Sequence, residues 1–225
     1  MPKLISRVDI LPRPQRQLWG ELGQTPKRFG FVMYGGTALA LRLGHRQSVD
    51  FDFFATAPFV SSSLLSEIPY LDGATVQRSS ENTLTCLVDR GGPVQVSFFG
   101  GLSLNRVEDP DVAENGIKIA SLLDLAATKV KVILDRASAK DYQDIDALLQ
   151  TGMNLTEALG AAVAVYGPQF NPLLSLKALT YFEDGDVKRL APDAQVRLRT
   201  AAAADITRIP KFRPLRELDP ERLRS

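Results

Sequence analysis

Hydrophobic and polar positions change their spacing near the middle of this 225-residue chain. Up to about residue 100, short apolar runs alternate with turn residues, as is typical of β-strands. After residue 115, apolar positions recur at helical spacing over longer stretches. The pattern predicts an α/β (α+β) unit with a mixed sheet over residues 1–112 and a helical unit over residues 113–225.

Four runs rich in Val, Phe and Thr are predicted strands. They are RFGFVMY (28–34), SVDFDFF (48–54), LTCLVD (84–89) and VQVSFF (94–99). The sequence DRGGP between the last two predicts a hairpin. Residues 37–43 are predicted as a short packed helix with Thr37 as its N-cap, and residues 60–67 as a second helix.

Four segments of the second half are predicted helices. They span residues 119–134, 140–152, 155–167 and 193–205. Ser121 and Asp124 fit the first turn of the first of these helices, and Gly152 closes the second.

Composition narrows the kinds of site that the chain can hold. A formal net charge of +1 argues against a broadly basic surface for nucleic acid. The single cysteine, Cys86, excludes an internal disulfide, and the single histidine, His45, excludes a multi-histidine metal site within one chain. No stretch reaches the ~18 apolar residues of a membrane span, and the N-terminus lacks the apolar core of a signal peptide. We therefore expect a cytoplasmic protein without a membrane partner.

Two aspartates interrupt a phenylalanine-rich predicted strand. Residues two apart on a strand face the same side, so Asp50 and Asp52 would project together. Val49, Phe51 and Phe53 would then pack on the other side. Such a pair suits a hard divalent cation, because Mg²⁺ and Mn²⁺ prefer oxygen ligands. On this spacing alone, an edge strand with both aspartates facing water is the simpler interpretation.

The segment YGGT at 34–37 joins a strand end to a helix start. Glycines there let backbone N–H groups approach a phosphate, and the helix N-terminus adds a favourable field. The Thr37 hydroxyl can cap the helix or donate to a phosphate oxygen. A tight turn that needs glycine for its backbone angles is the alternative. With Asp50 and Asp52 one helix later, the segment indicates a site for a metal-bound nucleoside triphosphate.

Two motifs resemble a known family. The stretch GGTALALRLGHRQSVDFDFF is similar to the signature of the AbiEii/AbiGii-type toxin nucleotidyltransferases, within the DNA polymerase β-like nucleotidyltransferase superfamily. The segment SLLDLAATKVKVILDRASAKDYQDIDALL resembles the helical motif of that family, lysine, arginine, then basic–Asp–x–x–Asp. This motif covers Lys129, Arg136, Lys140, Asp141 and Asp144. The resemblance spans residues 29–150 and implies a nucleotidyltransferase-like mixed sheet with flanking helices, followed by a helical C-terminal part that completes the cleft.

The resemblance also implies roles for individual residues of the first motif. Asp50 and Asp52 would be catalytic metal ligands. The nucleotide-binding candidates of this motif are Gly35, Gly36, Thr37 and Arg46, of which Arg46 would meet a phosphate or the substrate.

In the second motif, the resemblance places Lys129 near the nucleotide phosphates and Asp141 or Asp144 at the rear of the cleft, all three as candidate catalytic residues. Arg136 is a further nucleotide-binding candidate. Lys129, Arg136 and Lys140 recur at intervals of seven and four, so one helical face would present them together if the helix continues. The residues alone leave open a solvated basic stripe paired with the two aspartates.

One position departs from the superfamily pattern. A third carboxylate commonly lies on a neighbouring strand, where it is often the base that activates the attacking hydroxyl. The equivalent strand here is VQVSFF, and Ser97 occupies the position where an acid is expected. Asp89 lies near, in the predicted hairpin turn. Either two aspartates suffice with help from elsewhere, or the site binds nucleotide without turning it over.

The leading hypothesis is therefore Mg²⁺-dependent (or Mn²⁺-dependent) transfer of NMP from an NTP to an RNA, with tRNA a candidate, or to a protein. The resemblance implies the toxin of a toxin–antitoxin or phage-defence pair, with an antitoxin encoded nearby. A non-catalytic NTP-binding or interaction protein with a degenerate site is the alternative. A glycosyltransferase is a third reading, because Asp-x-Asp also binds the metal of nucleotide sugars.

Overall fold

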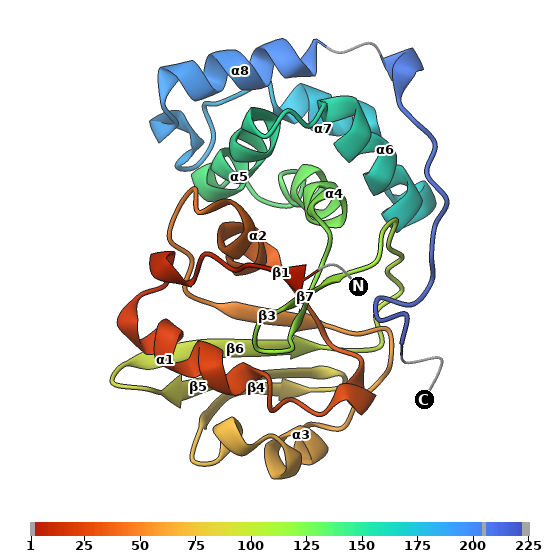
Figure 1. Ribbon diagram of the computed structural model, residues 1–225. Coiled ribbons are helices and arrows are strands. Elements are labelled where there is room, and N and C mark those ends of the chain that lie inside the picture. Colours follow the sequence, from red (N-terminus) through yellow and green to blue (C-terminus); the bar gives the residue numbers. More distant parts are fainter. Residues whose placement is uncertain (1–2, 204–205, 222–225) are drawn as a thin grey trace. The chain divides into compact units, whose positions relative to one another are not determined.

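The computed structural model describes residues 3–203 and 206–221, which form two compact units (Figure 1). The first unit contains the chain up to Leu104, the segment Asp109–Ser121 and the segment that begins at Arg216. The second unit contains Asn105–Glu108 and Leu122–Leu215. Among the described residues, no helix is long and apolar enough to cross a membrane.

The first unit is built on a mixed sheet, which has eight strands among the described residues. In spatial order these are β1 (Lys3–Leu4), β7 (Asp111–Ala113), β8 (Lys118–Ile119), β2 (Val32–Tyr34), β3 (Phe51–Phe54), β6 (Pro93–Phe99), β5 (Thr83–Asp89) and β4 (Thr75–Ser80). The pairs β1–β7, β8–β2 and β3–β6 are parallel, and the other neighbours are antiparallel. The mixed sheet with flanking helices confirms the predicted fold class. β7, which contains residue 112, pairs within this sheet with β8, which follows it.

The four predicted strands and the hairpin are confirmed as β2, β3, β5 and β6. The first is shorter than the predicted 28–34, because β2 begins at Val32 and Lys27–Phe29 form a 3₁₀ segment. β4 was not predicted, because its six residues, TVQRSS, are all exposed and show no apolar alternation. The prediction that the aspartate strand begins at residue 48 is wrong. β3 begins at Phe51, so Asp50 precedes it, and Val49 is 41% exposed instead of packed.

One face of the sheet carries the core of the first unit. Phe51 and Phe53 of β3 are fully buried, as are their partners Val96 and Phe98 of β6. Helix α1 (Arg13–Leu22) packs on this face, where Trp19 stacks on Phe51 with ring centroids 6.3 Å apart. The other helices of this unit are α2 (Gly35–Leu43) and α3 (Ser61–Glu67). The opposite face of β3 and β6 therefore remains available for polar side chains.

The C-terminal segment completes the first unit through an ion pair. The buried Nζ of Lys118 lies 2.5 Å from Oδ1 of Asp219 and 2.7 Å from Oε2 of Glu221. Because an ammonium group is costly to bury without counter-charges, these two carboxylates allow β8 to be buried at that position.

The second unit is helical. It contains α4 (Leu122–Val132), α5 (Ala139–Gln150), α6 (Leu155–Tyr166), α7 (Pro172–Ala178) and α8 (Pro192–Ala202). α4 packs against α6 and α5. The helices predicted for this half are confirmed as α4, α5, α6 and α8, whereas α7 was not predicted. The predicted start of the first helix at residue 119 is wrong, because Ile119 pairs with Met33 as part of β8 and α4 begins at Leu122. The predicted end of α8 at residues 204–205 lies outside the described residues.

Six short 3₁₀ segments connect these elements in the part of the chain that the structure describes. They are η1 (Val8–Ile10), η2 (Lys27–Phe29), η3 (Pro69–Leu71), η4 (Gly167–Gln169), η5 (Val187–Arg189) and η6 (Ile206–Arg208).

Candidate functional site

Two consecutive glycines form the junction between β2 and α2, and two charged side chains lie against them. Gly35 adopts φ = +80°, a conformation that L-residues with a side chain rarely adopt. A Cβ at Gly35 would lie 2.6 Å from Oδ2 of Asp52, and a Cβ at Gly36 would lie 2.6 Å from a terminal guanidinium nitrogen of Arg46. The absence of side chains thus lets a carboxylate and a guanidinium approach the first turn of the helix. Four residues predicted for the site are brought together here.

Thr37 ties this helix to the segment before β3. It is 1% exposed, and its hydroxyl donates to the backbone oxygen of Asp50 at 2.5 Å and lies 2.9 Å from the hydroxyl of Ser48. The helix begins at Gly35 with Tyr34 as N-cap, so the prediction of Thr37 as N-cap is wrong. The buried hydroxyl instead fixes the position of Asp50, whose own side chain is exposed.

Asp52 is the second residue of β3, and the sheet register places a polar neighbour beside it. Its partner in the parallel strand β6 is Ser97, the position where a third carboxylate was expected. Ser97 is 3% exposed, and its hydroxyl accepts a hydrogen bond from Thr85 of β5 at 3.4 Å. The neighbour of Asp52 on this side is therefore a hydroxyl group.

Asp89 does not replace the missing acid. Its Oδ1 accepts hydrogen bonds from the backbone N–H groups of Gly91 at 2.9 Å and Gly92 at 3.0 Å, which stabilises the hairpin turn. It also lies four residues along β5 from Thr85, about 13 Å away at the rise of a strand. Within residues 3–203 and 206–221, no group of three or more His, Cys, Asp or Glu side chains is arranged to hold a metal ion.

In the second unit, the charged residues of the second motif form a buried cluster. Nζ of Lys129 lies 2.9 Å from Oδ1 of Asp141 and 2.6 Å from Oδ2 of Asp144. All three side chains are at most 6% exposed. Arg136 is largely exposed and approaches the same cluster, with its Nε 2.7 Å from Oδ2 of Asp141. Lys129 is thus the counter-ion of two buried carboxylates.

The idea of one continuous helical face for this motif is wrong. α4 ends at Val132 and α5 begins at Ala139, so the chain turns between Lys129 and Lys140. The turn brings Lys129, Arg136 and the aspartates together, whereas Lys140 is exposed. Because the cluster is buried, it is not a solvated stripe either.

The cluster changes the ionisation of Asp141. Burial alone would raise the pKa of its carboxyl group, but the hydrogen bond from Arg136 and the charge of Lys129 outweigh burial. The pKa of Asp141 is therefore held below its ordinary value, and the carboxylate stays charged at neutral pH. The ion pairs of Lys129 with Asp141 and Asp144 hold α4 against α5.

Comparison with known families decides the assignment. A family model described as "Nucleotidyl transferase AbiEii toxin, Type IV TA system" matches residues 16–217. The chain belongs to the AbiEii nucleotidyltransferase toxin family. The predicted resemblance is confirmed.

Individual proteins similar to this AbiEii-family chain have also been found. An uncharacterized protein of Aquifex aeolicus (strain VF5) is 36% identical over 158 residues, which cover 68% of this chain and 74% of that protein. Among solved structures, the Megavirus polyadenylate synthase aligns with a TM-score of 0.42 and 16% identity over 60% of this chain. The aligned part is 31% of the polyadenylate synthase chain.

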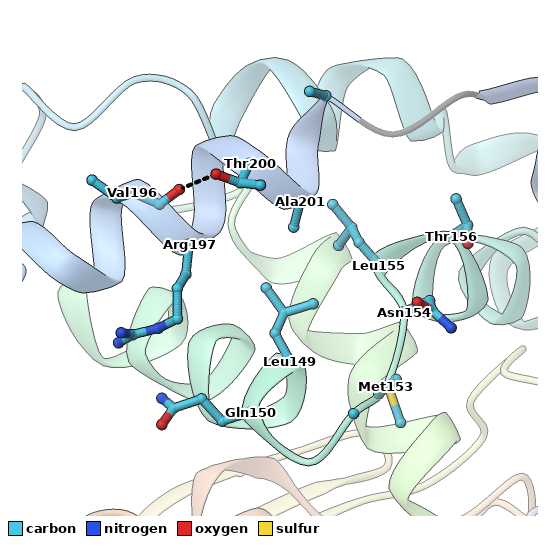
Figure 2. Close-up of a pocket in the computed structure, with 12 residues that line it drawn as sticks. Leu149, Gln150, Met153, Asn154, Leu155, Thr156, Val196, Arg197, Thr200 and Ala201 are labelled. Carbon is cyan, nitrogen blue, oxygen red and sulfur yellow. Dashed lines mark hydrogen bonds between the residues drawn. The ribbon is translucent and has the colours of Figure 1, made fainter.

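Two pockets of this AbiEii-family protein lie outside the motif residues. Figure 2 shows one of about 560 Å³ in the second unit, where Leu149, Leu155 and Ala201 point toward one another. The other, of about 390 Å³ in the first unit, includes Lys118 and Phe31 among its lining residues. Neither pocket is lined by a residue predicted for the site.

Sequence reasoning missed Ser48 and Thr85. Nothing in the sequence distinguishes Ser48 from other loop serines. A signal for Thr85 was present, because the hairpin that pairs Asp89 with Pro93 also places Thr85 opposite Ser97.

Proposed function

We propose that this protein is an Mg²⁺-dependent nucleotidyltransferase that transfers NMP from an NTP to an acceptor hydroxyl. The observation that carries the proposal is the junction of β2 and α2, where the Gly35–Gly36 backbone lies between the carboxylate of Asp52 and the guanidinium of Arg46. The acceptor class is RNA, with tRNA a candidate, or protein. Membership of a type IV toxin family supports a role as the toxin of a toxin–antitoxin pair, acting in the cytoplasm with an antitoxin encoded nearby.

The start of α2 has the chemistry of a phosphate site. The first backbone N–H groups of a helix have no partner within it, and the helix dipole favours an anion there. Gly36 has no side chain of its own, so the guanidinium of the half-buried Arg46 lies close to the helix start, where it adds a positive charge that can bind phosphate oxygens in two places. The triphosphate would therefore lie along the first turn of α2.

The donor set fits a magnesium ion. Mg²⁺ is usually held by one or two carboxylates together with substrate phosphates and water. Asp50, which is exposed, and Asp52, which lies against the phosphate site, would supply these carboxylates. When bound, the ion would neutralise charge on the phosphates and the leaving pyrophosphate. Mn²⁺ accepts the same oxygen donors.

The transfer itself is a substitution at phosphorus. The acceptor oxygen forms a bond to the α-phosphorus, the bond from that phosphorus to the bridging oxygen breaks, and pyrophosphate leaves with the electron pair. The acceptor proton passes to solvent, because Ser97 is not a base at neutral pH. Thr37 contributes by holding the backbone of Asp50, and Arg46 by orienting the triphosphate.

Label transfer tests the proposal. The protein is incubated with α-³²P-labelled NTPs, MgCl₂ and either total RNA or total protein, and Asp52→Asn is compared with Asp72→Asn, an exposed aspartate outside the site. Asp52→Asn is expected to lower transfer by at least about 100-fold, as for loss of an electrostatic catalytic group, with Asp72→Asn unchanged. Transfer that persists unchanged in the double variant Asp50→Ala/Asp52→Ala refutes the site.

The hydroxyl of Ser97 beside Asp52 favours a second candidate, an NTP-binding protein without turnover. This candidate predicts that NTP and Mg²⁺ raise the melting temperature while no label reaches RNA or protein. Detected transfer rejects it. Stronger stabilisation by a UDP-sugar than by any NTP would instead support a glycosyltransferase.

The toxin role has its own test. Induced expression is expected to arrest growth, and co-expression of the neighbouring gene product is expected to relieve the arrest. Growth that continues in the presence of active enzyme would contradict the toxin role.

A further inference from the structure

A row of polar side chains crosses the sheet from the candidate site to its edge. In register, Tyr34 of β2 pairs with Asp52 of β3, Asp52 with Ser97 of β6, Ser97 with Thr85 of β5, and Thr85 with Arg78 of β4. Paired residues of neighbouring strands project from the same face. Asp52 and Thr85 are half-buried, and Arg78, on the edge strand, is exposed. A basic group therefore lies on the same sheet face as the carboxylate of the site.

A β-bulge places Arg78 on this face. Val76 pairs with the fully buried Cys86, but the register then shifts and Arg78 pairs with Thr85. Without the extra residue, Gln77 would lie opposite Thr85, and Arg78 would turn to the face of the buried Leu84. Bulges often redirect a side chain beside an active site. This bulge aligns the guanidinium with the row that contains Asp52.

Two aromatic rings flank the row. Phe54 and Phe99 are paired in register two residues beyond Asp52 and Ser97, so they lie about 6.6 Å further along the strands on the same face. Both are half-buried, and they meet edge to face with centroids 5.5 Å apart. Phe54 also stacks on Tyr34 at 5.1 Å. Surfaces for single-stranded nucleic acid combine aromatic rings with basic groups, and here two half-exposed rings lie on the same sheet face as Arg78.

We propose that this surface binds the single-stranded 3′ end of an RNA acceptor. We name it the acceptor strip and define it by Asp52, Ser97, Thr85, Arg78, Phe54 and Phe99. The proposal rests on the proposed function, since the strip begins at the carboxylate where transfer would occur. Arg78 binds a backbone phosphate, the hydroxyls of the row accept and donate along the sugar-phosphate chain, and the rings support a base.

The width of the sheet sets the length of RNA involved. Asp52 and Arg78 are three strand spacings apart, about 14 Å at ~4.8 Å per spacing. At a rise of 3.4 Å per stacked nucleotide this is about four nucleotides. Arg78 therefore contacts a phosphate within about four nucleotides of the reacting 3′ hydroxyl, and an acceptor without a phosphate makes no such contact.

The strip is tested by binding of a 5′-fluorescein-labelled 12-nucleotide RNA with a free 3′ hydroxyl, followed by fluorescence anisotropy over a range of KCl concentrations. Arg78→Ala is compared with Arg13→Ala, which removes an equally exposed charge from the helix on the other face of the sheet. Arg78→Ala is expected to weaken binding up to about fivefold, as for the loss of one solvent-exposed ion pair. It should also reduce the slope of log K against log[salt] by about 0.7, the value for one single-strand phosphate. Arg13→Ala is expected to bind like the wild type.

A nucleoside, which has a 3′ hydroxyl and no phosphate, provides the control for the phosphate contact. In competition with the 12-mer, its affinity is expected to be the same for the wild type and Arg78→Ala. Equal losses in the two arginine variants, or a nucleoside as sensitive to Arg78 as the 12-mer, would overturn the proposal.

A measurement of nucleotide binding distinguishes failure of the acceptor strip from failure of the proposed nucleotidyltransferase function. The rise in melting temperature with ATP, GTP, CTP or UTP and Mg²⁺ is measured on the same samples, and Arg78→Ala is expected to leave it unchanged. A wild-type protein that is stabilised by NTP but does not bind the 12-mer refutes the strip alone. Label transfer to a protein acceptor without RNA binding does the same and leaves the proposed function standing.

Discussion

The single variants Gly35→Ala and Gly36→Ala distinguish the effect of backbone strain on stability from the effect of the proposed phosphate site on NTP binding. In Gly35→Ala, the new side chain is placed on a residue at φ = +80°, and its Cβ lies 2.6 Å from Oδ2 of Asp52. In Gly36→Ala, φ is not in this region, and the nearest atom is the end of the flexible Arg46 side chain, also at 2.6 Å. Both added Cβ atoms would therefore lie 2.6 Å from a side-chain atom, but only the one at Gly35 also imposes an unfavourable backbone conformation.

The expected magnitudes follow from these contacts. An L-residue held in the left-handed region costs about 1–2 kcal/mol, so Gly35→Ala is expected to lower the melting temperature by about 2–8 °C for a chain of this size. In Gly36→Ala, Arg46 moves about 1 Å to restore an ordinary contact distance, and the gain in helix propensity of up to ~1 kcal/mol offsets this movement. Gly36→Ala is therefore expected to melt like the wild type.

The assay for the pair is thermal unfolding followed by circular dichroism, with and without NTP and Mg²⁺. Gly36→Ala is expected to bind NTP about tenfold more weakly, a loss of about 1.4 kcal/mol, because the methyl group covers the backbone and displaces Arg46. An unchanged NTP effect in Gly36→Ala would refute the phosphate site. A Gly35→Ala variant as stable as the wild type would refute the strain argument.

Three further predictions concern buried polar groups. Thr37→Val removes the hydroxyl that donates to Asp50 and is expected to cost about 1–3 kcal/mol, with Thr37→Ser closer to the wild type in urea unfolding. Lys129→Met leaves two carboxylates buried without their counter-ion and is expected to cost about 3–5 kcal/mol, against about 1 kcal/mol or less for the exposed Arg136→Ala; equal losses would contradict the burial argument. Since the pKa of Asp141 is lowered in the folded state, its stabilisation is present above the unfolded pKa of about 3.9 and is lost as the pH falls toward the folded value. Urea unfolding between pH 2 and 5 should therefore show a steeper loss for the wild type than for Asp141→Asn.

The parts of the fold that were predictable are those with a buried face. β3 and β6 alternate buried and half-buried residues or carry continuous apolar runs, so the sequence indicates them directly. β4 is exposed throughout and is held by backbone pairing to β5, which leaves no hydrophobic period to detect. α1 was also missed, although its buried residues Leu18, Trp19 and Leu22 recur at helical spacing.

The sequence predicts which residues belong to the candidate site, but it does not predict their hydrogen bonds or their partners in the sheet. Asp50, Asp52 and the glycines are recognisable from residue type and spacing. The buried hydroxyl of Thr37 and the pairing of Asp52 with Ser97 depend on how the chain folds back, which local patterns do not encode. The turn between α4 and α5 likewise converts a predicted helical face into a buried ion cluster.

The ion pair between Lys118 and the C-terminal segment affects when the first unit can finish folding during translation. Asp219 and Glu221 leave the ribosome only after the entire second unit has been translated, yet they neutralise a lysine in the sheet of the first. Domains generally fold as units while the chain grows, and here the first unit cannot complete this ion pair before the helical unit has been translated. A nascent chain arrested at Leu215 would contain all eight described strands of the sheet but would leave the buried Lys118 without these two counter-charges. Translation order would thus delay completion of the first unit until the segment with Asp219 and Glu221 has been made.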